Sequence, residues 1–285
     1  MDLAHPEFVP DPDRSREEME DLQRAVAETA VFADDFEFGP DAFALDGPLS
    51  LETVRTDGQS TLADVADAGG ADADRGDDAD AESADAPVVV GVDQAFLEER
   101  AVSAIVAIQD GRVIDRAHAV TPLSIPYVPG LLAFREGGPI LEAFEALSVE
   151  PDLAVFDGNG RIHFRQAGIA THVGVTLDLP SVGVAKNHLC GTPDEDPDGR
   201  SEGWRTPVRA DDRVEAPEGT VLGHLYQSRQ YESSRSINPI YVSPGHRVSP
   251  ATAVDLIESL CAGYKLPEPT RLADAYAAEV KAQYD

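Results

Sequence analysis

The stretch PVVVGVDQAF (residues 87–96) decides the fold, because it opens a block of closely spaced strand-forming segments. Its run of valines predicts a short buried strand. Two more strands are expected to follow, VSAIVAIQ (102–109) and RVIDRAHAV (112–120). Asp110-Gly111 lies between them and is the strongest short signal for a two-residue hairpin. The domain therefore begins with three antiparallel strands.

Beyond this hairpin, helices and strands alternate. Residues 130–147 favour a helix that is interrupted at residues 137–139 (Gly-Gly-Pro), with the proline opening its second half. LAVFD (153–157) is a continuous apolar run, typical of a covered parallel strand. A helix over about 166–178 and the strand SVGVAK (181–186) follow. Later elements are expected to be strands near 204–209, 219–226 and 239–243 and helices near 250–262 and 270–284.

This element order matches the ribonuclease H-like superfamily. We predict an α/β fold over residues 87–285, a ribonuclease H-like mixed β-sheet with three antiparallel strands followed by parallel strands, flanked by helices. Residues 1–35 form an N-terminal segment with an amphipathic helix at 14–32. Residues 36–86 are interpreted as an acidic low-complexity insertion or linker, expected to be disordered because Ala, Asp and Gly bury too little surface to offset the ordering entropy.

The formal net charge of -31 is extreme. Such a balance normally argues against a polyanionic partner, because lysines and arginines supply the affinity for phosphates. The 22 basic residues, however, include only three lysines, Lys186, Lys265 and Lys281. A dense acidic surface with almost no lysine is typical of molar salt, where a Debye length of about 3 Å screens the self-repulsion. We interpret the charge as halophilic, archaeal adaptation and not as evidence about partners.

The chain shows no feature of a secreted or membrane protein. Cys190 and Cys261 are too few for a disulfide framework and lack metal-ligand spacing, which favours reduced thiols. The first residues contain no basic and apolar targeting pattern, and no apolar run approaches about 18 residues. We expect a cytoplasmic protein, a monomer, with no membrane partner.

Two apolar strands end in an acid, Asp93 after VVVGV and Asp157 after LAVF. Such acids lie where the edge of an open α/β sheet forms a crevice. Either aspartate alone would be an ordinary strand-end residue. Two of them on adjacent strands form a carboxylate pair that is costly unless a cation is shared, so the pattern predicts a hard-metal site. Glu136, at the expected helix interruption, either leans over this crevice or is an exposed helix acid.

Several long motifs resemble the endonuclease V family. They are PYVPGLLAFREG (126–137), VFDGNGRIHFRQAGIATHVG (155–174), LPSVGVAKNHLCG (179–191), SPGH (243–246) and PEPTRLADAY (267–276). The resemblance covers about residues 87–284, with the motifs in family order and spacing. It implies a ribonuclease H-like fold, binding of Mg²⁺ or Mn²⁺, and hydrolysis of the second phosphodiester bond 3′ to deoxyinosine in DNA. Some family members prefer inosine in RNA.

The resemblance makes Asp93, Glu136 and Asp157 the metal-site carboxylates, in agreement with the pattern of strand-end acids. A divalent ion lowers the pKa of bound water and neutralises charge on the phosphate, and Mg²⁺ needs few carboxylates. His246 is implied to position the attacking water or a phosphate oxygen; without the family match it would be an exposed loop histidine. Lys186 is implied to lie near the scissile phosphate.

Pro126-Tyr127-Val128-Pro129 matches the wedge loop of this family, which most often has isoleucine in place of Val128. Two prolines stiffen the loop and present Tyr127 at its tip, where a planar side chain can fill the gap left by an everted base. The alternative is a tyrosine packed inward.

The resemblance also implies a pocket for the everted hypoxanthine. It is expected to be lined by main-chain groups near Gly130, Leu132, Gly158 and Ile169. His163 and Arg165 are expected to contact phosphate or to support the site, and His172 is as compatible with the core as with the site. Asn159 stands where the family varies, and Phe164 replaces a common proline.

Two other interpretations share some of these features. Another ribonuclease H-like nuclease, such as an excision-repair module or a junction resolvase, would use the carboxylates without needing the Pro-Tyr-Val-Pro loop. A non-catalytic acidic binding protein would fit the charge, but the intact set of Asp93, Glu136 and Asp157 disfavours it.

Overall fold

The computed structural model describes residues 1–52, 86–123, 125–231 and 236–284. Most of the expected acidic insertion at 36–86 therefore lies outside the described residues. None of the helices in this part of the chain combines the length and apolar character needed to cross a bilayer.

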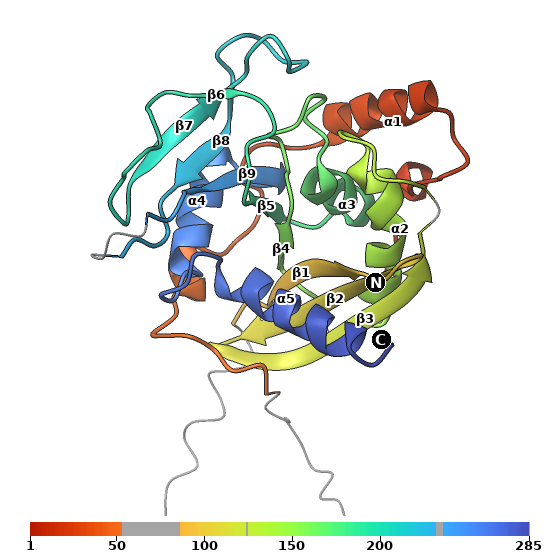
Figure 1. Cartoon of the computed structure of the whole chain (residues 1–285), viewed down its shortest axis with the longest axis horizontal. Coiled ribbons are helices and arrows are strands. Elements are labelled where there is room, and N and C mark those ends of the chain that lie inside the picture. Colours follow the sequence, from red (N-terminus) through yellow and green to blue (C-terminus); the bar gives the residue numbers. More distant parts are fainter. Residues whose placement is uncertain (53–85, 124, 232–235, 285) are drawn as a thin grey trace, which may run out of the picture.

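The described residues form a nine-stranded mixed sheet in the order β3-β2-β1-β4-β5-β9-β8-β7-β6 (Figure 1). The strands are β1 (Val89–Phe96), β2 (Arg100–Gln109), β3 (Arg112–Pro122), β4 (Leu153–Asp157), β5 (Ser181–Ala185), β6 (Thr192–Pro193), β7 (Arg205–Arg209), β8 (Val221–Tyr226) and β9 (Ile240–His246). β1, β2 and β3 pair antiparallel, whereas β4 pairs parallel with both β1 and β5. The predicted ribonuclease H-like mixed sheet is confirmed.

The β2–β3 turn has the geometry that its sequence predicts. Asp110 and Gly111 have φ angles of 49° and 66°. Positive φ at both central residues is what a two-residue type I′ hairpin requires, and Asp-Gly adopts it at little cost. The turn therefore fixes the register of the first hairpin.

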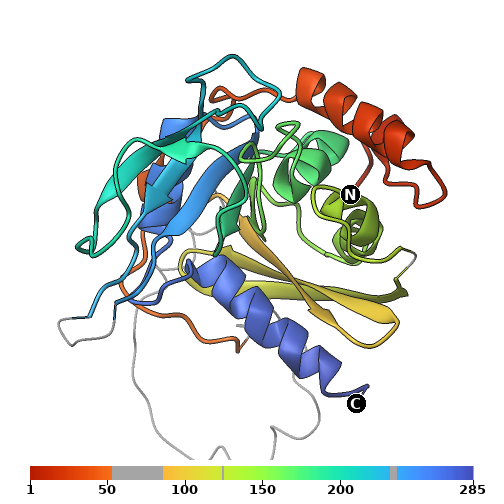
Figure 2. The same cartoon turned by 45° about the horizontal axis from the view of Figure 1, so that its top comes forward.

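Helices cover both faces of the sheet (Figures 1 and 2). They are α1 (Arg16–Thr29), α2 (Leu132–Glu145), α3 (Ile169–Leu177), α4 (Pro250–Ser259) and α5 (Glu268–Lys281), with 3₁₀ turns at η1 (Pro6–Phe8) and η2 (Pro40–Phe43). α2 and α3 share one apolar core with the sheet, and α4 and α5 share another on the opposite face. α1 packs on the outside of α2 and α3.

The expected interruption of the second helix was wrong. α2 runs unbroken from Leu132 to Glu145 with Pro139 inside it. The proline lacks the N–H that would bond the carbonyl four residues earlier, which disfavours a helix interior. Burial overrides this local cost, because Phe134, Ile140 and Phe144 lie in the core on either side of the proline.

The N-terminal segment is part of the folded body. α1 begins with a capping box, in which Ser15 Oγ accepts from the Glu18 N–H (3.3 Å) and Glu18 Oε2 accepts from the Ser15 N–H (2.8 Å). Its buried face lies on the core, as the amphipathic pattern predicts. Farther along, Phe43 is buried, and the Leu49 N–H donates to Glu268 Oε2 (2.7 Å). Residues 36–52 thus contribute to the core.

His172 on α3 is a core residue. Its side chain is fully buried, Nε2 donates to the Phe8 carbonyl (2.7 Å), and the Phe134 ring meets it edge-on at 5.4 Å. Nδ1 has no partner among the described residues. Burial lowers the pKa of His172 to about 4, and the bond to Phe8 opposes the shift only partly. The imidazole is therefore neutral in the folded protein.

This burial predicts a pH-dependent stability. Between pH 6.5 and about 4 the unfolded chain binds a proton at His172 that the folded chain does not. The free energy of unfolding therefore has its full value above pH 6.5. It falls toward pH 4 by about 3 kcal/mol through this one group. Denaturant unfolding of His172→Gln in molar KCl should show a shallower decline than the unsubstituted protein. An equal decline of the unfolding free energy with falling pH in both proteins would contradict the assignment of His172 as a neutral core residue.

Candidate active site

The parallel pairing of β1 and β4 brings two aspartates together. Val92 lies opposite Phe156, where the parallel pairing of β1 with β4 ends, so the next residues, Asp93 and Asp157, lie side by side. Asp157 is the last residue of β4, but Asp93 lies inside β1, which continues to Phe96 paired with β2, so Asp93 is not the strand-end residue that its sequence predicted. Glu136 approaches from α2 and is 9% exposed. Gln94 ties the elements to each other, since its Nε2 donates to Ser103 Oγ and to the Glu136 carbonyl (3.2 Å each). The structure brings these three predicted acids to one region.

The electrostatics show that the acids are close and poorly solvated. Burial raises the pKa of Glu136 to about 7, with Asp157 adding to the shift and Arg135 opposing it. Burial, and then the charge of Asp157, likewise raises the pKa of Asp93. Both shifts mean that the charged forms lack sufficient counter-charge. The edge of the sheet is therefore a site that favours an added cation.

Lys186 supplies part of that counter-charge. It directly follows β5, and its Nζ donates to Asp157 Oδ2 at 2.6 Å. Burial works against the charged amine, but this bond and the charges of Asp157, Asp93 and Asp274 outweigh it, so the pKa of Lys186 is raised. The resemblance implied a place near the scissile phosphate, and in the structure the ammonium of Lys186 is bonded to the carboxylate of Asp157.

Asp274 is a fourth acid at this edge, and the sequence reasoning missed it. It lies on α5, and its charge raises the pKa of both Asp93 and Lys186. α5 reaches the site because Gly91 has no side chain: a Cβ there would stand 1.9 Å from the Pro269 carbonyl oxygen. The PEPTRLADAY motif contained the signal, but nothing in a helical pattern says which strand the helix crosses.

The donor set suits a hard cation such as Mg²⁺. Carboxylate oxygens are the ligands that Mg²⁺ prefers, and the pKa values of Asp93 and Glu136 are raised first by burial and then by the nearby charge of Asp157. Over the described ranges, no three His, Cys, Asp or Glu side chains converge tightly enough to hold one ion. The acids thus lie in one region and carry suitable donor oxygens. One of them, Asp157, is bonded to the Lys186 ammonium.

His246 is not brought to these acids. It pairs with Ser181 at the start of β5, whereas Asp157 pairs with Val184, three residues or about 10 Å farther along that strand. The ring is 4% exposed. Its Nδ1 accepts from the Val31 N–H (3.2 Å), and Nε2 donates to Asp178 Oδ1 (3.0 Å). Neither a role in positioning water nor an exposed loop histidine fits this buried, doubly bonded ring.

A pocket lies between α1, α3 and the loop before α2, and we name it the Gly130 pocket. Its lining includes five of the predicted residues, Tyr127, Gly130, Leu132, His163 and Ile169. It also includes residues without a predicted contact, Gln23, Ala133, Asn159, Ala167, Gly168 and Leu189. Gly158 stands behind it, since a Cβ there would meet Ile169 Cγ2 at 2.5 Å.

His163 and Arg165 support this pocket from inside. Burial lowers the pKa of His163 to about 3, and the Arg165 charge adds to the effect. The neutral ring donates from Nε2 to the Gly130 carbonyl (3.1 Å), and Arg165 Nη2 donates to the same oxygen (3.3 Å). Of the two expectations for these residues, the bonds match support of the site, because an uncharged buried imidazole is a poor phosphate ligand.

Tyr127 lies at the mouth of the pocket with 64% of its surface exposed. A tyrosine packed inward is thereby excluded. The adjoining Val128 packs against the apolar cluster under α1, whereas Tyr127 is exposed together with the prolines on either side, Pro126 and Pro129.

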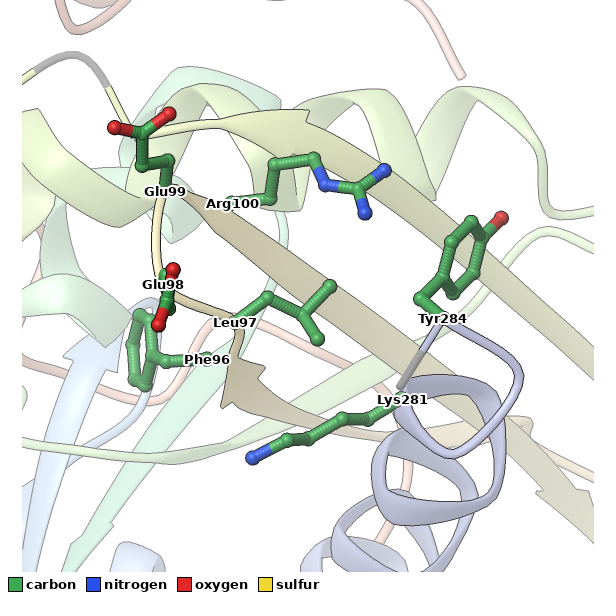
Figure 3. Close-up of a pocket in the computed structure, with 7 residues that line it drawn as sticks. All are labelled: Phe96, Leu97, Glu98, Glu99, Arg100, Lys281 and Tyr284. Atoms are coloured by element: carbon green, nitrogen blue, oxygen red, sulfur yellow. The ribbon is translucent and has the colours of Figure 1, made fainter.

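A separate surface groove contains none of the predicted site residues. It lies between the β1–β2 turn and the end of α5, with Leu97 at its centre. Figure 3 shows the Arg100 guanidinium directed at the Tyr284 ring, 5.0 Å from its centroid. Glu98 and Glu99 also line it, so the groove carries mixed charge.

A ribonuclease H-like sheet with two acids side by side, where the parallel pairing of β1 and β4 ends, defines a class of phosphodiester-cleaving enzymes. The family model for endonuclease V matches residues 74–275. The endonuclease V of Haloarcula marismortui is 54% identical over 282 residues, 98% of this chain and 97% of that protein. That of Natronomonas pharaonis is 50% identical over 284 residues, 100% and 99% of the two chains. This chain belongs to the endonuclease V family and is a nuclease.

Solved structures agree in fold. The endonuclease V from Streptomyces avermitilis is 28% identical with a TM-score of 0.67, covering 95% of this chain and 94% of that one. The endonuclease V from Ciona intestinalis, solved with a 24-mer DNA containing an inosine followed by a ribo-adenosine, has a TM-score of 0.64. It is 22% identical and covers 94% of this chain and 98% of that one, so it shows the fold alone.

The amount by which the buried acids lower the free energy of unfolding can be measured. Asp93→Asn removes a charge that burial and Asp157 both penalise. At about pH 9, without divalent ions, the variant should unfold with a free energy larger by at least about 1 kcal/mol. The exposed Asp212→Asn is the control, since it removes a charge away from the site. Equal stability of both variants in denaturant titrations would refute the account.

Proposed function

We propose that this nuclease hydrolyses the second phosphodiester bond 3′ to deoxyinosine in DNA, as a divalent-metal-dependent repair enzyme. The observation that carries the proposal is the pairing of two features. Acids gather at one sheet edge, and the Gly130 pocket opens nearby with Tyr127 at its mouth. The two meet in one short segment, because Asp157 ends β4 and Asn159, two residues later, lines the pocket.

We assign Asp93, Glu136 and Asp157 as the carboxylates that would hold Mg²⁺, with Mn²⁺ as an alternative ion. Such an ion supplies a water of lowered pKa and neutralises charge on the phosphate. Lys186 would release Asp157 to the ion and turn its ammonium toward a phosphate oxygen. Asp274 adds negative charge on the α5 side, which increases the affinity of this edge for a cation.

The substrate contacts proposed for the loop and pocket follow from their shape. The planar, exposed Tyr127 would occupy the space that an everted base leaves in the duplex. The base would enter the Gly130 pocket, where glycine main chain allows close approach. Residues assigned to substrate binding or to its support are Pro126, Tyr127, Val128, Pro129, Gly130, Leu132, Gly158, His163, Arg165 and Ile169.

Support for DNA as the partner comes from the Ciona intestinalis relative, which was solved with inosine-containing DNA. Inosine in RNA is a second substrate that the same pocket would accept, because the base is identical. We further propose that the enzyme acts as a cytoplasmic monomer. The projecting Tyr127 and the pocket beside it favour this function over an excision-repair module or a resolvase, which need neither feature.

The first test is cleavage. With Mg²⁺ in molar KCl, the protein should nick a duplex with one deoxyinosine and leave the matched undamaged duplex whole. Asp157→Ala should lower the rate about a thousandfold, since metal-bound stabilisation is worth several kcal/mol. Circular dichroism should stay native, because Asp157 is the last residue of β4 and belongs to neither apolar core.

Equal cutting of both duplexes would favour another ribonuclease H-like nuclease. Retained activity in Asp157→Ala would refute the carboxylate assignment. The same assay with inosine-containing RNA beside DNA ranks the two substrates.

The second test concerns the loop. Tyr127→Ala should reduce the preference for inosine over undamaged DNA about tenfold, since one base–aromatic contact is worth roughly 1–3 kcal/mol. Stability should hardly change, because the ring is mostly exposed. Tyr231→Ala, another exposed tyrosine, is the matched control. An unchanged preference would mean that Tyr127 does not enter the duplex.

A further inference from the structure

The Gly130 carbonyl is the most heavily bonded acceptor of the pocket. It receives Gln23 Nε2 at 2.9 Å, His163 Nε2 at 3.1 Å and Arg165 Nη2 at 3.3 Å. Gly130 has a φ of 81°, a left-handed conformation that favours glycine. It is the residue at which the Tyr127 loop turns into α2. Its carbonyl orientation therefore sets the direction in which the loop leaves the body.

Gln23 comes from α1, more than a hundred residues earlier. It is fully buried, and its carboxamide is used at both ends. Nε2 donates to the Gly130 carbonyl and, at 3.4 Å, to the Ala167 carbonyl, while Oε1 accepts from Arg165 Nε at 2.8 Å. A buried polar side chain in the middle of an apolar helix face is costly unless fully bonded, and this one is.

The apolar neighbours of Gln23 hold the helix in place independently of these bonds. Met19, Leu22 and Val26 on α1 pack against the cluster that contains Leu131 and Phe134, and Val128 joins its edge. These apolar contacts, together with the ion pair of Arg24 with Glu215, dock α1. The amide of Gln23 adds a directional contact to the loop.

We propose that Gln23 is a positioning residue, which fixes Gly130 so that the Tyr127 loop and the Gly130 pocket hold the shape that receives an everted base. The inference rests on the proposed function for the meaning of the pocket. It adds α1, which precedes the segment matched by the family model, to the recognition site. The proposed chemistry of bond cleavage, at Asp93 and Asp157, does not involve it.

The test compares Gln23→Met with Leu22→Ala. Methionine keeps the length and the helix propensity of glutamine but neither donates nor accepts strongly. Leu22→Ala loosens the packing of α1 while leaving the amide bonds in place. In the nicking assay, Gln23→Met should raise KM for the inosine duplex about fivefold to tenfold, the worth of one buried hydrogen bond, with kcat unchanged. Leu22→Ala should lower Tm and leave KM unchanged.

Amide hydrogen exchange provides a readout without substrate. In Gln23→Met, exchange should accelerate in residues 125–131 and stay constant within α1; Leu22→Ala should show the reverse. Unchanged exchange of the loop, or an equal rise of KM in both variants, would overturn the proposal. If the unsubstituted protein does not nick inosine DNA, the proposed function fails, and exchange alone still decides whether Gln23 holds the loop.

Discussion

The structure depends on one costly arrangement, two aspartates held side by side where the parallel pairing of β1 and β4 ends. The β1–β4 register leaves no freedom here, because Val92 opposite Phe156 places Asp93 next to Asp157. Their repulsion in a poorly solvated edge must be offset by the rest of the fold. The covered sheet with two apolar cores provides this stability, and function uses part of it. A site of this kind is stable in spite of its acids and gains from any cation that joins them.

The chain segment that follows Asp157 also forms part of the wall of the Gly130 pocket. After Asp157 the chain turns through Gly158 and Gly160 into α3, with the Gly158 N–H bonded to the Val184 carbonyl (2.8 Å) and the Ala170 N–H to the Asn159 carbonyl (3.1 Å). Gly160 can have no side chain there, because a Cβ would stand 2.3 Å from the Pro244 carbonyl oxygen. This rigid segment joins the acids to the wall of the pocket. The acids and the Gly130 pocket are thereby kept at a fixed separation.

The sequence predicted those features that local pattern controls. Apolar runs ending in Asp93 and Asp157 revealed both strands and their acids, and Asp110-Gly111 revealed the hairpin. Features set by distant packing were not predictable. Gln23 and Asp274 lie on amphipathic helices, where periodicity marks the buried face but not the partner. His246 was misplaced because a motif gives a residue type, whereas the antiparallel register of β9 on β5 decides which end of the sheet it occupies.

The acidity of the chain bears on how it would hold a nucleic acid. Two cations predicted at the site are already bonded within the described structure, Lys186 to Asp157 and Arg165 to Gln23 and Gly130. His163 is neutral. In molar salt, free cations on the surface would contribute little to phosphate binding, because counterion release loses its advantage. The proposed site, with main-chain groups, a planar tyrosine and a shared metal ion, would lose less, because such contacts are short-ranged and largely shielded from salt. Molar salt, which would screen a charge of -31, would thus favour recognition by shape over recognition by charge.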